Sequence, residues 1–466
     1  MIVQDAKRGW IVSLSILALF PLYFASYHYH LAHSSALALK PPHNSLILDR
    51  STFIREWLDV HVGDPSKGSS LARLCNQSHI RWRPNLVLNL DDANGGIGNV
   101  RGNILDFLFF AVEAGASIML PSFAARSRTD LSSLWNGKIG FETFFDEDYF
   151  VNAFANACPQ LDIYKQIDGQ GLSPALPARY GPPSMRSDMD PAHTPRSAVG
   201  HFNSWLVEQQ ADLSTTVLVN FGRTLWEGPD TRSIPSEIRR DFGGLLRLQP
   251  NVRRLAASIV YNLSHRFLIP IDPGRLYYPH AFYGAHLRTE QDAANAGWIN
   301  DGPHANFSSQ TSDYLAKAID AGLSVIYTAS GDASELSRFA DKAWSWHRIN
   351  VTSKHELLFG DDLAALQAMT WDQQALVDYE VLQRCSQFGG YVKSSFSYNI
   401  AITRSVMAEL EGKSQEPFRT KPTDDTVAFE DSLSTVWGRD GLHESKVPRG
   451  AWPKRSDNSF GHRRSR

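Results

Sequence analysis

Three scarcities narrow the classes of protein to which this chain of 466 residues can belong. It has only 3 cysteines, and no spacing of cysteine and histidine in it resembles a zinc site. Its formal net charge of -3 gives no polycationic surface, so we expect no nucleic-acid partner. No Gly-Lys-Ser or Gly-Lys-Thr follows the glycine-rich loop at residues 94–99, which excludes a Walker-type phosphate loop there.

That glycine-rich loop joins an apolar stretch at 85–90 to an amphipathic stretch at 100–115. The order predicts a buried strand, a tight loop and a helix. Glycines let a ligand approach the backbone, and the first amides of a helix can donate to a phosphate. A dinucleotide-binding Rossmann unit is disfavoured, because the next apolar stretch ends in Pro121 and Ser122 instead of the acidic residue that would hold a ribose. We expect a nucleotide or sugar-nucleotide site of another kind, with an ordinary turn as the alternative.

Residues 10–27 form an apolar segment of about the length that spans a membrane, preceded by Lys7 and Arg8. The positive charges place residues 1–9 in the cytoplasm. We therefore expect a type II signal anchor, with the catalytic part in the lumen of the Golgi or endoplasmic reticulum. A cleaved signal peptide is the alternative, with small residues at 34–38.

Alternating apolar and amphipathic stretches predict two α/β domains with parallel strands, at residues 71–270 and 271–413. Residues 28–70 have little periodicity and are expected to form a stem. The segment 414–466 is rich in Pro, Asp, Ser and Arg and is expected to be disordered.

The three cysteines allow one disulfide and one free thiol. We favour Cys75 with Cys158, because both lie in the expected N-terminal domain. The sequence leaves the pairings with Cys385 open.

Two later segments carry side chains suited to an anionic ligand. His286 and Arg288 stand two residues apart on an expected strand at 281–288, so their side chains project to one face. Ser394 and Ser395 precede an expected helix at 398–411, where serines cap the helix or cradle an anion. A structural reading is open for each residue: a buried core histidine, a surface ion pair or a simple cap.

Together, three segments resemble the successive motifs of the GDP-fucose-dependent protein O-fucosyltransferase superfamily in order and spacing. They are Gly-Gly-Ile-Gly-Asn-Val-Arg at 95–101, His-Leu-Arg at 286–288, and a third motif that runs from Asp378 through 388–390 and 394–397 to Arg404. The resemblance covers residues 85–404. It implies a GT-B fold, in which two Rossmann-like domains face each other across a cleft. It also implies inverting, metal-independent transfer of fucose from GDP-fucose to a protein hydroxyl or a glycan, without a cofactor.

The resemblance also implies roles for single residues. Arg288 would neutralise the charge that grows on the β-phosphate, since a guanidinium is the strongest donor available without a metal. Asn99 would lie near the transferred sugar. Contacts with the nucleotide sugar are expected from Gly96, Gly98, His286, Asp378, Ser394, Ser395 and Phe396.

One position departs from the family pattern. Some members carry a glutamate three residues before the loop asparagine as general base, and this chain has Gly96 there. Either the base lies elsewhere, with Asp92, Glu290 and Asp292 as candidates, or the mechanism has no dedicated base. We choose Asp292 because it follows the His-Leu-Arg segment by one short loop.

Two other functions stay open. The missing glutamate is compatible with a catalytically silent protein of the same fold that binds glycans or client proteins. The pair Asp188 and Asp190 is compatible with a metal-dependent glycosyltransferase, because hard oxygen ligands suit divalent cations.

Overall fold

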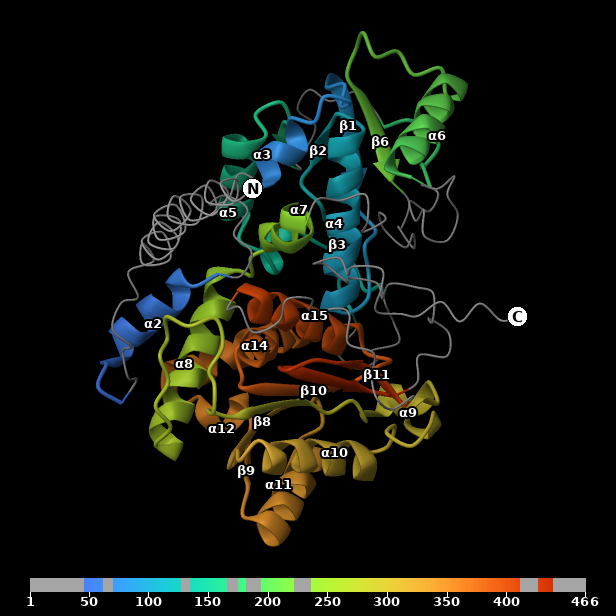
Figure 1. Ribbon diagram of the computed structural model, residues 1–466. Coiled ribbons are helices and arrows are strands. Elements are labelled where there is room, and N and C mark those ends of the chain that lie inside the picture. Colours follow the sequence, from blue (N-terminus) through green and yellow to red (C-terminus); the bar gives the residue numbers. More distant parts are fainter. Residues whose placement is uncertain are drawn as a thin grey trace, which may run out of the picture.

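The computed structural model describes residues 46–61, 70–126, 135–165, 175–181, 194–221, 236–410 and 426–438. These residues form an α/β fold with two mainly parallel sheets (Figure 1), which confirms the expected class. No helix within the described ranges has the length and apolar character needed to cross a membrane. Residues 10–27, the expected anchor, lie outside those ranges.

The first sheet has four parallel strands in the order β5-β2-β1-β6. Residues 86–90 of its strand β1 are all buried, as a strand covered on both faces requires. Helix α4 packs on this sheet, and every residue of α4 except Asn99 is buried. The elements of this part are α2 (Arg50–Asp59), α3 (Ser70–Cys75), β1 (Arg83–Leu90), α4 (Ile97–Glu113), β2 (Ala116–Met119), β3 (Phe123–Ala124), β4 (Lys138–Ile139), η1 (Phe141–Thr143), α5 (Glu147–Ala157), β5 (Ile163–Tyr164), α6 (Pro195–Glu208), β6 (Val217–Phe221), α7 (Ser236–Asp241), η3 (Phe242–Leu245) and α8 (Pro250–Phe267).

The second sheet has the order β11-β12-β10-β7-β8-β9, in which only the edge strand β11 is antiparallel. Helices α14 and α15 cover one face, and α10 and α11 lie on the other (Figure 1). The elements are β7 (Tyr283–His286), α9 (Gln291–Asn295), η4 (Trp298–Asn300), α10 (Phe307–Asp320), β8 (Val325–Ala329), α11 (Ala333–His347), β9 (Asn350–Thr352), α12 (Lys354–Leu357), α13 (Gly360–Ala368), α14 (Trp371–Gln383), β10 (Gln387–Tyr391), α15 (Ser395–Leu410), β11 (Val427–Glu430) and β12 (Ser434–Trp437).

Two boundaries differ from the sequence-based expectation. Residues 426–438, which we expected to be disordered, form β11 and β12 and extend the second sheet. Their short apolar runs are buried against the sheet, and this tertiary burial outweighs the polar composition around them. Helix α2, expected in the stem, and helix α8, expected in the N-terminal domain, pack together, and α8 packs against α14 beside the second sheet.

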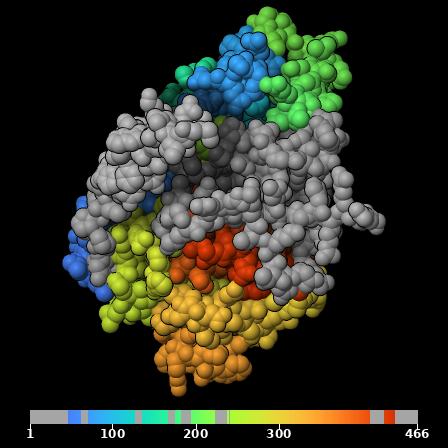
Figure 2. Space-filling view, in the orientation of Figure 1, coloured from blue at the N-terminus to red at the C-terminus, as the bar shows by residue number. Residues whose placement is uncertain are grey.

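The two sheets share one apolar core. A single cluster of buried residues runs from β1 and α4 through α8 to α14 and α15, and α4 contacts α15 directly. Figure 2 shows the surface of the C-terminal described residues, in red, between the blue-to-green and the orange ends of the molecule. The disulfide joins Cys75 to Cys158, which confirms the favoured pairing, and Cys385 is free and buried.

The strand order of the second sheet reverses once, which marks the place where a ligand-binding crevice is expected. From β7 the chain passes to β8 and β9 on one side and returns to β10 on the other, so β7 and β10 flank the point where the order reverses. In open α/β sheets, ligands bind outside the carboxyl ends of the strands at such a point. His286 ends β7, and the serine-rich segment at 394–397 follows β10.

Candidate active site

The first loop ends where α4 begins. Gly95 has a φ of 95°, a left-handed conformation that favours glycine, and Gly96 is the N-cap of α4 without a side-chain cap bond. A Cβ built on Gly95 would lie 2.7 Å from Nδ2 of Asn99. The turn therefore folds back on Asn99, the one residue of α4 that is not buried.

The first and third motifs meet at Gly98. A Cβ at this position would lie 2.6 Å from the backbone oxygen of Ser395 and 2.8 Å from its hydroxyl oxygen. Only a residue without a side chain permits this approach. Two predicted site residues that are far apart in the sequence thus touch where α4 and α15 begin.

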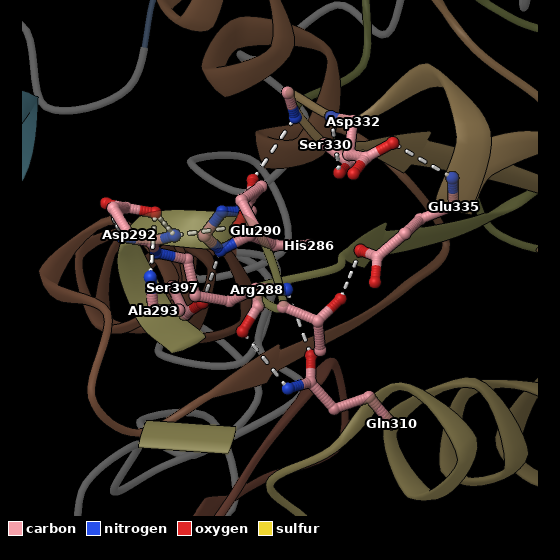
Figure 3. A network of polar contacts seen from close by, with 12 residues as sticks. His286, Arg288, Glu290, Asp292, Ala293, Gln310, Ser330, Asp332, Glu335 and Ser397 are labelled. Atoms are coloured by element: carbon pink, nitrogen blue, oxygen red, sulfur yellow. Dashed lines mark hydrogen bonds and ion pairs between the residues drawn. The ribbon is translucent and has the colours of Figure 1, made fainter. Parts of the chain in front are cut away.

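His286 lies buried between β7 and α15 (Figure 3). Its Nδ1 shares a hydrogen bond of 2.7 Å with the hydroxyl of Ser397, and its ring centroid lies 4.6 Å from that of Phe396. Burial, and to a lesser degree the charge of Arg288, lowers the pKa of His286 from 6.5 to about 3. The imidazole is therefore neutral near pH 7.

This neutral histidine predicts a measurable acid sensitivity. In the unfolded chain His286 binds a proton at a higher pH than in the folded chain. The contribution of its neutral side chain to the free energy of unfolding is therefore complete above about pH 6.5 and is lost as the pH falls towards 3. Between about pH 6.5 and 4.5, we expect wild type to lose roughly 1–3 kcal/mol more free energy of unfolding than His286→Gln. Denaturant titrations at several pH values measure this difference. The exposed His201 is the control, since His201→Gln should keep the wild-type slope, and equal slopes for all three proteins would contradict the assignment.

Arg288 lies just beyond the end of β7, and its side chain is mostly buried. Its guanidinium donates through Nη1 to Glu290 (2.7 Å) and through Nη1 and Nη2 to the two oxygens of Asp292 (2.7 and 2.6 Å). It also stacks on the ring of Trp298, 5.2 Å from its centroid. Burial alone would lower the pKa of Arg288, but the two carboxylates outweigh it and raise the pKa. The group is a permanent, oriented cation.

The two candidate bases in this loop both bind Arg288. Asp292 uses both oxygens on the guanidinium, and Glu290 uses one, while its other oxygen accepts from the amide of Gly331 (3.1 Å). Burial would raise the pKa of Asp292, but its hydrogen bond with Arg288 and that charge lower it. In this arrangement Asp292 orients Arg288 and is a weak base. We name the part of the chain built around the first sheet the first half and the part built around the second sheet the second half. Asp92, the third candidate, lies 3.4 Å from Arg179 in the first half.

Several residues that contact His286 and Arg288 were not predicted from the sequence. Gln310 on α10 accepts from the amide of Arg288 (3.0 Å) and donates to its carbonyl (3.3 Å), so it fixes the backbone of this segment. Ser397 shares a hydrogen bond with His286, and the ring of Trp298 stacks against Arg288. Ser397 stood inside the third motif, whereas no sequence pattern singles out Gln310 or Trp298.

Asp378 lies in a separate buried cluster. Its two oxygens accept from the hydroxyl of Tyr327 (2.6 Å) and from Nζ of Lys354 (2.5 Å). Among the described residues its hydrogen bonds go to Tyr327 and Lys354 and not to His286 or Arg288, and its role at the donor stays a prediction. Ser394 is buried just before α15, and its carbonyl accepts from the amide of Tyr398.

Among the described residues, no group of three or more His, Cys, Asp or Glu side chains is arranged to hold a metal ion. Asp188 and Asp190 lie outside those ranges.

The chain is similar to a known protein family over a range that includes all three motifs. The family model described as "GDP-fucose protein O-fucosyltransferase" matches residues 86–407. No curated protein sequence matches the chain. The crystal structure of POFUT1 in complex with GDP-fucose is 13% identical, covers 76% of this chain and 98% of its own, and gives a TM-score of 0.44.

Two further solved structures are similar. An Arabidopsis thaliana FUT1 mutant in complex with GDP is 12% identical, covers 78% of either chain and gives a TM-score of 0.35. NodZ alpha-1,6-fucosyltransferase soaked with GDP-fucose is 14% identical, covers 70% of this chain and 93% of its own, and gives 0.36. Similarity at this level assigns no role to any residue. The family match spans well over half of the chain, so the chain belongs to the GDP-fucose protein O-fucosyltransferase family of glycosyltransferases.

Proposed function

We propose that the chain transfers fucose from GDP-fucose to a hydroxyl of a protein or a glycan, with inversion at the sugar carbon and without a metal. The observation that carries the proposal is the guanidinium of Arg288, which lies mostly buried and oriented just beyond the carboxyl end of β7, near a neutral imidazole. We place the reaction in the lumen of the Golgi or endoplasmic reticulum, with residues 10–27 as membrane anchor. The two sheets would form the two facing domains of a GT-B enzyme.

The donor would bind at the crevice between β7 and β10. Its pyrophosphate would contact the first amides of α15 together with the hydroxyls of Ser394 and Ser395. Phe396 offers a ring next to His286, and Asn99 and Gly98 approach from the other half. We infer that GDP lies mainly against the second half and that the sugar points towards α4.

The reaction breaks the bond between the sugar carbon and the β-phosphate oxygen as the acceptor oxygen attacks that carbon. Negative charge grows on the β-phosphate during this step. The two terminal nitrogens of Arg288 now hold Asp292 and would hold two phosphate oxygens with the same fork. Arg288 would thereby stabilise GDP as the leaving group.

Asp292 would change partner when the donor binds. A phosphate on Arg288 displaces the carboxylate, which loses the pairing that lowers its pKa. The released carboxylate becomes a stronger base and could take the proton of the acceptor hydroxyl. We therefore keep Asp292 as the candidate base of the donor-bound enzyme.

The variant Asp292→Asn separates these two roles. Removing a negative charge that competes for Arg288 should tighten GDP binding by about 3- to 10-fold. Removing the base should slow transfer to an acceptor by about 10²-fold. Calorimetry with GDP and a transfer assay measure the two effects. Weaker GDP binding would contradict the displacement of Asp292, and unchanged transfer would exclude it as the base.

Calorimetry with GDP and UDP, with and without a chelator, tests the proposal and its alternatives. We expect GDP to bind more tightly than UDP and the chelator to change nothing. Loss of binding with the chelator would favour a metal-dependent enzyme. GDP binding without turnover on any acceptor would favour a catalytically silent protein. No GDP binding at all would reject both the fucosyltransferase and the silent protein.

A further inference from the structure

Arg126 belongs to the first half and lies beside the glycine-rich loop at 94–99. It follows β3, whose Ala124 amide donates to the carbonyl of Ala93 (2.8 Å), so this segment runs beside the loop after β1. A Cβ built on Gly96 would lie 3.9 Å from both terminal nitrogens of Arg126. The guanidinium would therefore touch a Cβ at position 96 at an ordinary van der Waals distance.

The same guanidinium binds the second half. Its Nε and one terminal nitrogen donate to a single oxygen of Asp372, at 3.0 and 2.5 Å, and it stacks 4.8 Å from the ring centroid of Trp371. Trp371 and Asp372 form the first turn of α14, where the helix dipole favours a carboxylate. Both charged side chains are largely buried, at 12% and 15% exposure, so removing either partner would leave the other without its ion-pair partner in a mostly buried site.

A chain of contacts leads from this pair to Arg288. A Cβ on Gly331 would lie 3.5 Å from the Trp371 ring, and the Gly331 amide donates to Glu290. The other oxygen of Glu290 accepts from Arg288 (Figure 3). Arg126, from the first half, thus lies beside the loop at 95–99. Through Trp371 it is also linked to the loop whose Glu290 binds Arg288.

We propose that Arg126 is a positioning residue for the transfer reaction. Its ion pair with Asp372 sets the distance between the Gly96–Asn99 loop, where the sugar would lie, and Arg288, where the phosphate would lie. This inference rests on the proposed function. It concerns the alignment of the two halves, whereas GDP would lie mainly against the second half.

The proposal predicts a split between turnover and binding. Misplacing reacting groups by about 1 Å can cost on the order of 10²-fold in rate. We expect Arg126→Ala and the nearly isosteric Asp372→Asn each to lower kcat for GDP-fucose hydrolysis by about 10- to 100-fold. Their Kd for GDP should stay within about 3-fold of wild type. Because both variants break one link, the double variant should be no slower than the slower single variant.

Arg247→Ala is the matched control. Arg247 binds one oxygen of Asp146 through two nitrogens (3.1 and 2.6 Å) and stacks on Tyr149 at 3.9 Å, so it has the same chemistry within the first half. We expect its kcat to remain within about 3-fold of wild type. If Arg247→Ala and Asp372→Asn slow the enzyme equally, or if Asp372→Asn retains wild-type kcat, Arg126 has no positioning role.

Hydrogen exchange tests the contact between Arg126 and Asp372 and its effect on the Arg288 loop without a measurement of turnover. In Arg126→Ala and Asp372→Asn, backbone amides of residues 290–301 and 330–332 should exchange faster than in wild type, and in Arg247→Ala they should not. Unchanged exchange in the first two variants would overturn the inference even if the enzyme is inactive. Conversely, faster exchange with a wild-type protein that neither binds GDP nor hydrolyses GDP-fucose would support the link and reject the proposed function.

Discussion

Replacing Arg288 with lysine should lower the rate of fucose transfer on the order of 10²–10³-fold. Lysine keeps the positive charge but loses the planar fork that can hold two phosphate oxygens. The charge on the β-phosphate grows as the bond breaks, so the lost interaction is stronger in the transition state than in the bound donor. The Kd for GDP should therefore change much less than kcat. Steady-state kinetics of donor hydrolysis and calorimetry with GDP measure the two quantities.

Arg254→Lys is the control for this substitution. Arg254 also donates a terminal nitrogen to a carboxylate, Asp362 (2.7 Å), but it lies on α8, away from the crevice between β7 and β10. We expect it to keep wild-type activity. If Arg288→Lys also stays within a few-fold of wild type, Arg288 does not stabilise the leaving group.

Replacing Arg404 with methionine should destabilise the fold by about 3–5 kcal/mol. The Arg404 side chain is fully buried in α15. It donates to the hydroxyl oxygen of Ser434 (3.1 Å) and to four backbone carbonyls, those of Gln383 (2.7 Å), Cys385 (2.7 Å), Ser386 (2.9 Å) and Leu433 (3.1 Å). Methionine fills similar space but leaves these buried acceptors without a donor. Chemical denaturation measures the loss.

Arg266→Met is the matched control, because half of the Arg266 side chain is exposed and it pairs with the equally exposed Glu356. Its free energy of unfolding should stay within about 1 kcal/mol of wild type. A loss of less than about 1 kcal/mol for Arg404→Met would show that water or a neighbouring group satisfies the acceptors, and that Arg404 does not clamp α15.

Local sequence patterns predicted the elements that carry the site. The apolar run at 85–90 and the glycine-rich turn identify β1 and the start of α4, because burial on both faces leaves a continuous apolar strand. Alternation along β7 was a weaker guide: the strand ends at His286, and contacts with Gln310 and Asp292 place Arg288 beyond it.

Tertiary contacts account for what the sequence could not predict. Strands β11 and β12 have four residues each, too short for a periodic signal within a polar segment. They are stabilised in the sheet because β12 pairs with β10 and β11 pairs with β12. Helix α8 precedes the second sheet in the chain but packs with α14. The roles of Glu290 and Asp292 as partners of Arg288 depend on a loop conformation that no spacing rule encodes.

The most direct test of the central claim is the turnover of a panel of GDP- and UDP-sugars by the purified full chain in the presence of a chelator, measured as nucleotide release. We predict that GDP-fucose is hydrolysed at least about 10-fold faster than any other donor, that the chelator has no effect, and that Arg288→Lys loses this activity. A clear preference for a UDP-sugar, or turnover that the chelator abolishes, would contradict the account.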